Sequence, residues 1–145
     1  MRRPSSTVLG LLLCLPLLAQ VPCENGFAGP YPCHNVDLMA FMGLGQLGTT
    51  TSVADLWGWT DPLNGREYAL VGTRTGTSFV DITDPTAPVL VGILPAHDNV
   101  SNLWRDVDVS GNWCFVGSEA GGHGLQVFDL TRLRNVTTPP ATFTE

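Results

Sequence analysis

The chain has 145 residues, and its seven basic residues, all arginines, are outnumbered by thirteen acidic residues, which gives a net charge of −6. A chain of this length is sufficient for one domain of ordinary size. Binding to nucleic acid or to an anionic membrane surface requires basic patches, so the acidic balance argues against both classes of partner. We therefore expect no nucleic-acid partner.

Residues 1–19 have the organisation of a secretory signal peptide. Arg2 and Arg3 supply a positive start, and residues 8–19 are predominantly apolar. The apolar run is shorter than the roughly 20 residues that cross a bilayer, and its flanks fit cleavage after Ala19. The sequence thus predicts a secreted or cell-surface protein that has no transmembrane segment after signal cleavage.

Residues 20–54 are expected to form a lead-in segment that precedes the repeats described below. Cys23 and Cys33 enclose a short loop rich in Gly and Pro, and in an oxidising compartment we predict a disulfide between them. The chain-entropy model gives such a bridge roughly 2 to 3 kcal/mol. Residues 36–42 fit either a short strand or one helical turn. Cys114 lies in an apolar strand pattern, which predicts a buried core residue rather than a reactive thiol.

From residue 55 onwards the sequence contains one pattern twice, in the expected units 55–98 and 99–145. Leu56-Trp57 returns as Leu103-Trp104, and two apolar runs return in the second unit, at offsets between 45 and 48 residues. The recurring runs are 69–72 with 114–117 and 79–83 with 127–131. Short apolar runs between Gly- and Pro-containing turns predict strands at 56–59, 67–72, 78–82, 89–94, 105–109, 113–117 and 125–130.

A repeat of 40 to 50 residues built from short β-rich runs is typical of a propeller blade. The predicted fold class is therefore all-β, a β-propeller with about two blades in this sequence. Since propellers contain roughly 4 to 8 blades, two units indicate a fragment, the front part of a truncated array. No segment after residue 19 has a helical period.

The two units resemble a known family. Three runs of the first unit are similar to the start of the choice-of-anchor B proteins, namely DLWGWTDP at 55–62, GREYALVG at 65–72 and GTSFVDI at 76–82. Three runs of the second unit are also similar to these proteins, namely LWRDV at 103–107, SEA at 118–120 and GHGLQVFDL at 122–130. The resemblance covers roughly residues 23–136, and the units are similar to LVIVD repeats. It implies a β-propeller and an extracellular or surface-displayed protein, often with a variable C-terminal anchor. It implies no established catalytic activity and no active site to carry over.

Four side chains form the one cluster of candidate metal ligands in the repeat region: His97, Asp106, Glu119 and His123. Histidine nitrogens and carboxylates suit zinc or a similar ion, but the spacing contains no HExxH or i, i+4 histidine pair. The alternative interpretation is that His97 and His123 cap turns while Arg105 and Asp106 form hydrogen bonds between blades. We favour this alternative and predict no cofactor.

Calcium and hydrolase chemistry have still weaker support. Asp81 with Asp84, and Asp106 with Asp108, lack the ligand series of a calcium loop. Residues 116–120 come nearest to a GxSxG nucleophile turn but lack the second glycine. The sequence therefore predicts no catalytic residue and no confident calcium or zinc site.

Two further features concern the surface and the space between blades. Asn99 and Asn135 begin N-x-S/T sequons in predicted loops, which makes them candidate glycosylation sites. Trp57 and Trp104 occupy equivalent repeat positions, and this equivalence predicts that both fill the space between blades.

Three functions are compatible with these observations. The first is a non-enzymatic, secreted β-propeller that binds an unknown extracellular protein or glycan through loops on a rigid scaffold. The alternative is a secreted metal-dependent hydrolase, or an accessory domain of one, that uses His97, Asp106, Glu119 and His123. A structural surface protein with a C-terminal anchor is the third. We favour the first.

Overall fold

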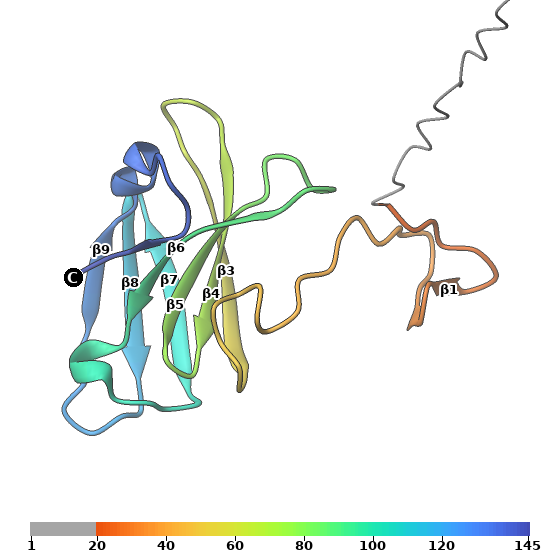
Figure 1. The fold of residues 1–145 in the computed structure, drawn as a ribbon. Helices are drawn as coiled ribbons and strands as arrows, with labels where there is room; N and C mark the ends of the chain where they lie inside the picture. The colour runs from red at the N-terminus through yellow and green to blue at the C-terminus, as the bar shows by residue number, and fades with distance from the viewer. Residues whose placement is uncertain (1–19) are drawn as a thin grey trace, which may run out of the picture.

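The computed structural model describes residues 20–145, and their two main sheets lie face to face (Figure 1). The signal peptide predicted at residues 1–19 lies outside this range. The first sheet is an antiparallel meander of β3 (Val53–Thr60), β4 (Glu67–Thr73), β5 (Gly76–Asp81) and β6 (Val89–Pro95), to which β10 (Ala141–Thr142) adds in parallel beside β6. The second sheet consists of β7 (Arg105–Ser110), β8 (Trp113–Ser118) and β9 (Gln126–Asp129). The predicted all-β class is confirmed.

The start of the lead-in segment forms a small hairpin away from the two sheets (Figure 1). Its strands are β1 (Phe27–Ala28) and β2 (Tyr31–Pro32), and the predicted disulfide joins Cys23 to Cys33. Residues 36–42 contain neither a strand nor a helical turn, and Leu38 makes only an isolated bridge to Val21.

Turn chemistry ends the strands where the sequence places short polar and glycine residues. After β3 the Asp61 carboxylate accepts a hydrogen bond from the Leu63 amide at 2.9 Å, which forms an Asx turn. The same turn closes at Gly65, whose φ of +72° favours glycine. Between β7 and β8, Gly111 adopts φ +59° in a two-residue connection. These turns let each apolar run fold back beside the preceding one.

The core lies between the two sheets and is built from alternate residues of their strands. Phe79 of β5 stacks on Phe128 of β9 with ring centroids 4.7 Å apart, and Phe143 packs edge-on to Phe128 at 4.9 Å. Aromatic pairs of this kind add about 0.5 to 1.5 kcal/mol to the burial of their area. The other buried apolar side chains of this core are Trp59, Tyr68, Leu70, Val91, Leu94, Val107, Cys114, Val116, Leu130 and Leu133.

The sheets stack through unlike faces. In the first sheet Leu70 and Phe79 point toward the second sheet and are fully buried. Their repeat equivalents, Phe115 and Val127, lie on the outer face of the second sheet, where Val127 is 40% exposed. The second sheet instead turns Cys114, Val116 and Phe128 inward. Equivalent faces of the two units therefore point in the same direction, so the units stack head to tail.

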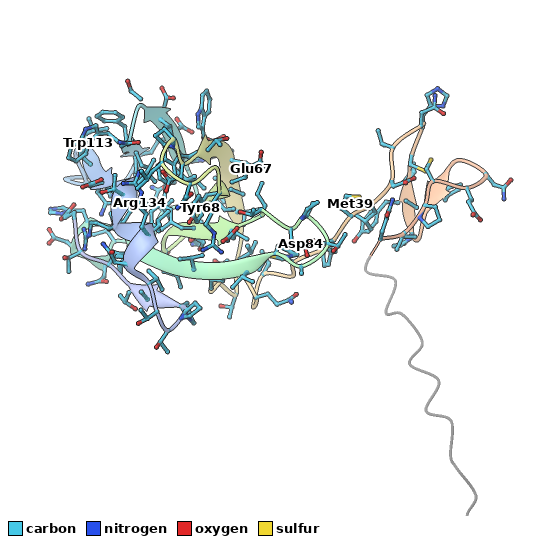
Figure 2. All side chains as sticks on the ribbon, turned by 90° about the horizontal axis from the view of Figure 1, so that it is seen from above. Met39, Glu67, Tyr68, Asp84, Trp113 and Arg134 are labelled. Carbon is cyan, nitrogen blue, oxygen red and sulfur yellow. A yellow bond between two sulfur atoms is a disulfide. The ribbon has the colours of Figure 1, made fainter. Side chains whose placement is uncertain are left out.

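The outer face of the first sheet is covered in part by the lead-in segment. Met39, Met42 and Leu47 line an apolar groove of about 420 Å³ together with residues of β3, β4 and β5. The Ser78 hydroxyl of β5 donates a hydrogen bond of 2.6 Å to the Leu47 carbonyl. The outer face of the second sheet has no such cover among the described residues, and its Trp113 lies on the side of the molecule away from Met39 (Figure 2).

The prediction that Trp57 and Trp104 fill the space between the sheets is wrong. Trp57 is 47% exposed and Trp104 is 59% exposed, and only Trp59 among the four tryptophans is buried. Trp57 lies on β3 and Trp104 precedes β7, and these two strands are the edges of their sheets. A large side chain at an edge has no neighbouring strand to cover its outer side.

One end of the seam between the sheets is held by a buried ion pair. Asp61, which is fully buried after β3, accepts hydrogen bonds from Arg134 Nε at 2.8 Å and Arg134 Nη2 at 2.6 Å. Arg134 comes from the 3-10 helix η2 (Leu130–Asn135), and Figure 2 shows it beside Tyr68. The hydrogen bonds from Arg134 hold the pKa of Asp61 below its ordinary value of 3.8.

We expect Asp61→Asn to lower the melting temperature by several degrees at pH 7. A depressed carboxyl pKa stabilises the fold above the unfolded pKa, and the effect is lost as the pH falls through the folded pKa. The gap between wild type and Asp61→Asn should therefore narrow on acidification below about pH 4. Thermal melts from pH 3 to pH 7 measure this, with Asp106→Asn on an exposed side chain as the control. A gap that stays constant with pH would contradict the role assigned to the ion pair.

The exposed outer face of the second sheet predicts self-association of a chain that comprises residues 20–145. Trp113, Phe115 and Val127 are the repeat equivalents of Tyr68, Leu70 and Phe79, which are all buried, and uncovered apolar patches promote association. Sedimentation should show concentration-dependent oligomers that Val127→Lys reduces. Val53→Lys, which alters a similarly exposed valine on β3 of the first sheet, should leave them unchanged. A monomer at all concentrations would disprove the prediction.

Candidate functional site

Four segments bring polar side chains together at the end of the seam opposite Asp61. They are the 3-10 helix η1 (His97–Asn99), the start of β7, the start of β9 with the loop before it, and the residues after β10. Figure 1 shows η1 and η2 at opposite ends of the stacked sheets. The cluster consists of Arg105 from β7, His123 and Gln126 from the second unit, His97 from η1, and Glu145.

Arg105 occupies the centre of this cluster and is fully buried. Its Nε donates a hydrogen bond of 3.0 Å to the Thr73 carbonyl of the first sheet, so the side chain crosses the seam. Its Nη1 reaches Nε2 of His123 at 2.8 Å and Oε1 of Gln126 at 3.5 Å. Gln126 in turn donates to the Pro95 carbonyl at 2.9 Å. The hydrogen bonding between sheets that was predicted for Arg105 and Asp106 is therefore observed for Arg105, whereas the exposed Asp106 side chain makes none with residues 20–145.

The hydrogen bonds of His123 fix its tautomer. Arginine has only donor nitrogens, so Nε2 of His123 must accept from Arg105 and carries no proton. The other ring nitrogen, Nδ1, lies 3.0 Å from the Gly124 carbonyl and is the donor of that hydrogen bond. His123 is thus a neutral imidazole, and its one free lone pair is directed at the guanidinium.

His97 pairs with the carboxylate of Glu145 through Nδ1 and lies 3.5 Å from Asp98 on its other side. The hydrogen bond from His97 lowers the pKa of Glu145, and the hydrogen bond to Glu145, with the nearby charge of Asp98, raises the pKa of His97. His97 is about one-third exposed. The two histidine rings lie edge to face with centroids 6.3 Å apart.

A pocket of about 290 Å³ opens beside this cluster. Leu94, Ala96 and Phe143 give it an apolar wall, while His97, Asp98, Asn99, Gln126 and Glu145 supply polar groups. A concave site with apolar walls and a few converging polar groups is the usual form of a small-ligand or side-chain binding site.

The four candidate metal ligands do not all come together. His97 and His123 are neighbours, but Asp106 and Glu119 are both exposed and make no side-chain hydrogen bond with residues 20–145. Within that range, no group of three or more His, Cys, Asp or Glu residues is placed to hold a metal ion.

The remaining sequence candidates lie apart from the chemistry of this cluster. Asn99 and Asn135 are both exposed, and Asn99 also lines the pocket. Cys114 is a free, fully buried thiol whose pKa burial raises to about 12, so it is not a nucleophile at neutral pH. The prediction that Cys114 is a core residue is confirmed.

Sequence reasoning missed Gln126 and Glu145. Gln126 stands at a core-facing position of β9, in alternation with the buried Phe128. A polar residue in register with core residues was a usable signal, because buried amides need partners. Glu145 gave no such signal, since its contact with His97 joins residues 48 positions apart.

We expect His97 to titrate above its ordinary pKa of 6.5, and Glu145→Gln to move the titration back toward that value. A raised histidine pKa stabilises the contact fully below pH 6.5, and the contribution is lost as the pH rises through the folded pKa. On the acid side the contact is lost as the pH falls through the pKa of Glu145, which lies below 4.5. NMR titration of the imidazole measures both effects, and identical curves for wild type and variant would show that the contact does not form.

Comparison with known proteins identifies the repeated units. Residues 66–95 and 104–130 match the model of the LVIVD repeat, a β-propeller-type unit. The first match covers β4 to β6 and the second covers β7 to β9. No curated protein and no solved structure matches the chain. Two segments of the chain therefore match the LVIVD repeat; the first supplies β4, β5 and β6 of the first sheet, and the second supplies all three strands of the second sheet.

Proposed function

We propose that the protein is a secreted or cell-surface, non-enzymatic β-propeller repeat protein that binds an extracellular protein or glycan. The observation that carries this proposal is the pocket of about 290 Å³ at one end of the seam, which residues from separate segments line on a repeat scaffold. Loops held by rigid sheets are the usual location of binding function. The LVIVD repeats supply the scaffold, and the fold alone does not name the ligand.

Several features support an extracellular location. The Cys23–Cys33 disulfide is stable in oxidising compartments, and residues 1–19 have the composition of a signal peptide. None of the helices in residues 20–145 is long and apolar enough to span a membrane. The resemblance to choice-of-anchor B proteins extends the proposal to display at the cell surface. Exposed Asn99 and Asn135 are sites where a glycosylating host would modify the chain.

The polar contacts in the cluster favour binding over metal-dependent hydrolysis. A metal ligand must offer a free lone pair. The lone pair on Nε2 of His123 already accepts a hydrogen bond from Arg105, and Nδ1 of His97 is paired with the Glu145 carboxylate. A buried guanidinium beside a histidine also repels a cation. We therefore propose a binding module without a resident metal.

We expect arrays of extracellular proteins and glycans to contain a ligand whose binding depends on the pocket. The full chain is secreted from a host with an oxidising pathway, and mass spectrometry should find Cys23 bonded to Cys33 with Cys114 free. Binding of the ligand should fall at least tenfold in Asp98→Asn, because one such polar contact is worth about 1.4 kcal/mol or more. Glu119→Gln removes an equally exposed charge elsewhere and should bind normally.

Metal analysis of the secreted chain separates the proposal from the hydrolase alternative. Stoichiometric zinc that His97→Ala and His123→Ala both abolish would overturn the binding-module assignment. Failure of Asp98→Asn to weaken any ligand found would move the binding surface away from this pocket.

A further inference from the structure

We propose that a cavity at the Asp61 end of the seam binds a carboxylate group on a short aliphatic stem. The cavity has a volume of about 130 Å³ and lies between the first sheet and the segment that begins with η2. It shares no lining residue with the ligand pocket proposed above and does not depend on the function of that pocket.

The register of the first sheet assembles one wall of the cavity. Tyr68 of β4 pairs with Asp81 of β5, and Asp81 pairs with Val89 of β6, so the three side chains stand side by side on one face of the sheet. Arg66, which precedes β4, reaches the same place and forms an ion pair with Asp81. Arg134 of η2 lines the cavity from the second unit. The cavity therefore depends on the stacking of the two units.

The arginines around this cavity retain hydrogen-bond donors without an acceptor. Nε and Nη2 of Arg134 are engaged by Asp61, and Nη1 has no acceptor among residues 20–145. Within the same residues the Arg66 guanidinium uses only Nη2, for Asp81. The Asp81 carboxylate is itself engaged, by Arg66 and by the Thr83 amide. Since arginine is a donor at all its side-chain nitrogens, a ligand of this cavity must supply acceptors.

The hydroxyl of Tyr68 is a further donor that opens into the cavity. The fully enclosed polar side-chain groups that lack a partner in residues 20–145 belong to Ser52, Thr77 and Arg105. The Tyr68 hydroxyl also lacks a partner there but is not one of these groups, so it keeps accessible surface although the residue as a whole is 2% exposed. Burial raises the pKa of Tyr68, so the hydroxyl holds its proton at neutral pH and donates it.

The charge of the lining selects an anion with one negative charge. The charged side chains that line the cavity are Arg66, Arg134 and Asp81, so the lining carries one positive charge in excess. Asp61 balances Arg134 from outside this lining. A carboxylate accepts hydrogen bonds from guanidinium and phenol donors, and such charge-assisted bonds are roughly twice as strong as neutral ones.

The space and the apolar walls set the size of the ligand. A water molecule takes about 30 Å³ of liquid volume, so the cavity admits a carboxylate with one or two further carbon atoms and excludes a sugar ring. Val91, Leu133 and Val136 provide apolar surface against which a short aliphatic stem packs. The acidic side chain of a partner protein and a free short-chain acid both have this chemistry.

NMR of the full chain with carbon-13 in its tyrosine rings tests the proposal, because Tyr31 and Tyr68 are the two tyrosines of the sequence. Propionate should shift the Tyr68 signals in a saturable way and leave unchanged those of Tyr31, which lies in β2 of the hairpin. Propionamide has the same shape without the charge and should shift neither. Sodium chloride at equal ionic strength should also shift neither.

Two matched pairs of variants test the assigned donors through the signals of propionate itself. Arg66→Gln should weaken propionate binding roughly tenfold, because hydrogen bonds to a charged group are the strong ones. Arg74→Gln, which removes an exposed arginine at the other end of β4, should bind as wild type does. Tyr68→Phe removes only the hydroxyl and should also weaken binding, whereas Tyr31→Phe should not.

Three outcomes overturn the proposal: no Tyr68 shift with propionate, equal shifts with propionate and propionamide or chloride, or equal binding by wild type and Arg66→Gln. The first two need no variant, so the test stands even where a variant does not fold. A blocked glutamate, N-acetylglutamate methylamide, then separates the two sources of the carboxylate. Binding of both probes supports an acidic side chain of a partner protein, and binding of propionate alone supports a free short-chain acid.

Discussion

The stacking of two repeat sheets through unlike faces is the constraint on which the rest of the structure depends. The face of the first unit that carries Leu70 and Phe79 receives the opposite face of the second unit, which carries Cys114, Val116 and Phe128. Such an arrangement is head to tail, so each contact leaves an unused face at both ends of the stack. The lead-in segment lies over one of these faces through Leu47, and the other carries Trp113 and Val127.

Different interactions hold the two sheets together in the middle of the seam and at its ends. Its middle is apolar, and contacts such as Phe79 on Phe128 supply non-directional stabilisation that tolerates sliding. Its ends carry directional contacts between sheets, namely Asp61 with Arg134 at one end and Arg105 with the Thr73 carbonyl at the other. Between them, the Asp55 carboxylate accepts from the Val107 amide at 2.8 Å, and Trp59 Nε1 donates to the Gly111 carbonyl at 3.1 Å. These contacts fix the register in which the apolar surfaces meet.

The sequence was sufficient for strands β3 to β9, the disulfide and the buried Cys114, because each depends on local pattern or short separation. It failed for Trp57 and Trp104: the two equivalent residues do have similar environments, but these lie at the edge strands β3 and β7, where both side chains are exposed, and not in the core. It also failed for the polar cluster. Arg105, Gln126 and His97 belong to three segments, and their contacts depend on how two sheets stack rather than on any local spacing. Of the four candidate metal ligands, His97 and His123 do lie close together, but Asp106 points to the outer face, whereas Arg105 next to it points inward.

The two ends of the seam differ in how their charge is balanced. Asp61 and Arg134 compensate each other within the fold, so the charge of that pair is balanced. Arg105 has strong directional contacts but no counter-charge within residues 20–145. A well-packed apolar side chain in its place would avoid the cost of desolvation and is often neutral or stabilising in proteins. A buried charge at such a position makes the fold less stable than an apolar residue would. Residues that cost stability in this way are characteristic of functional sites.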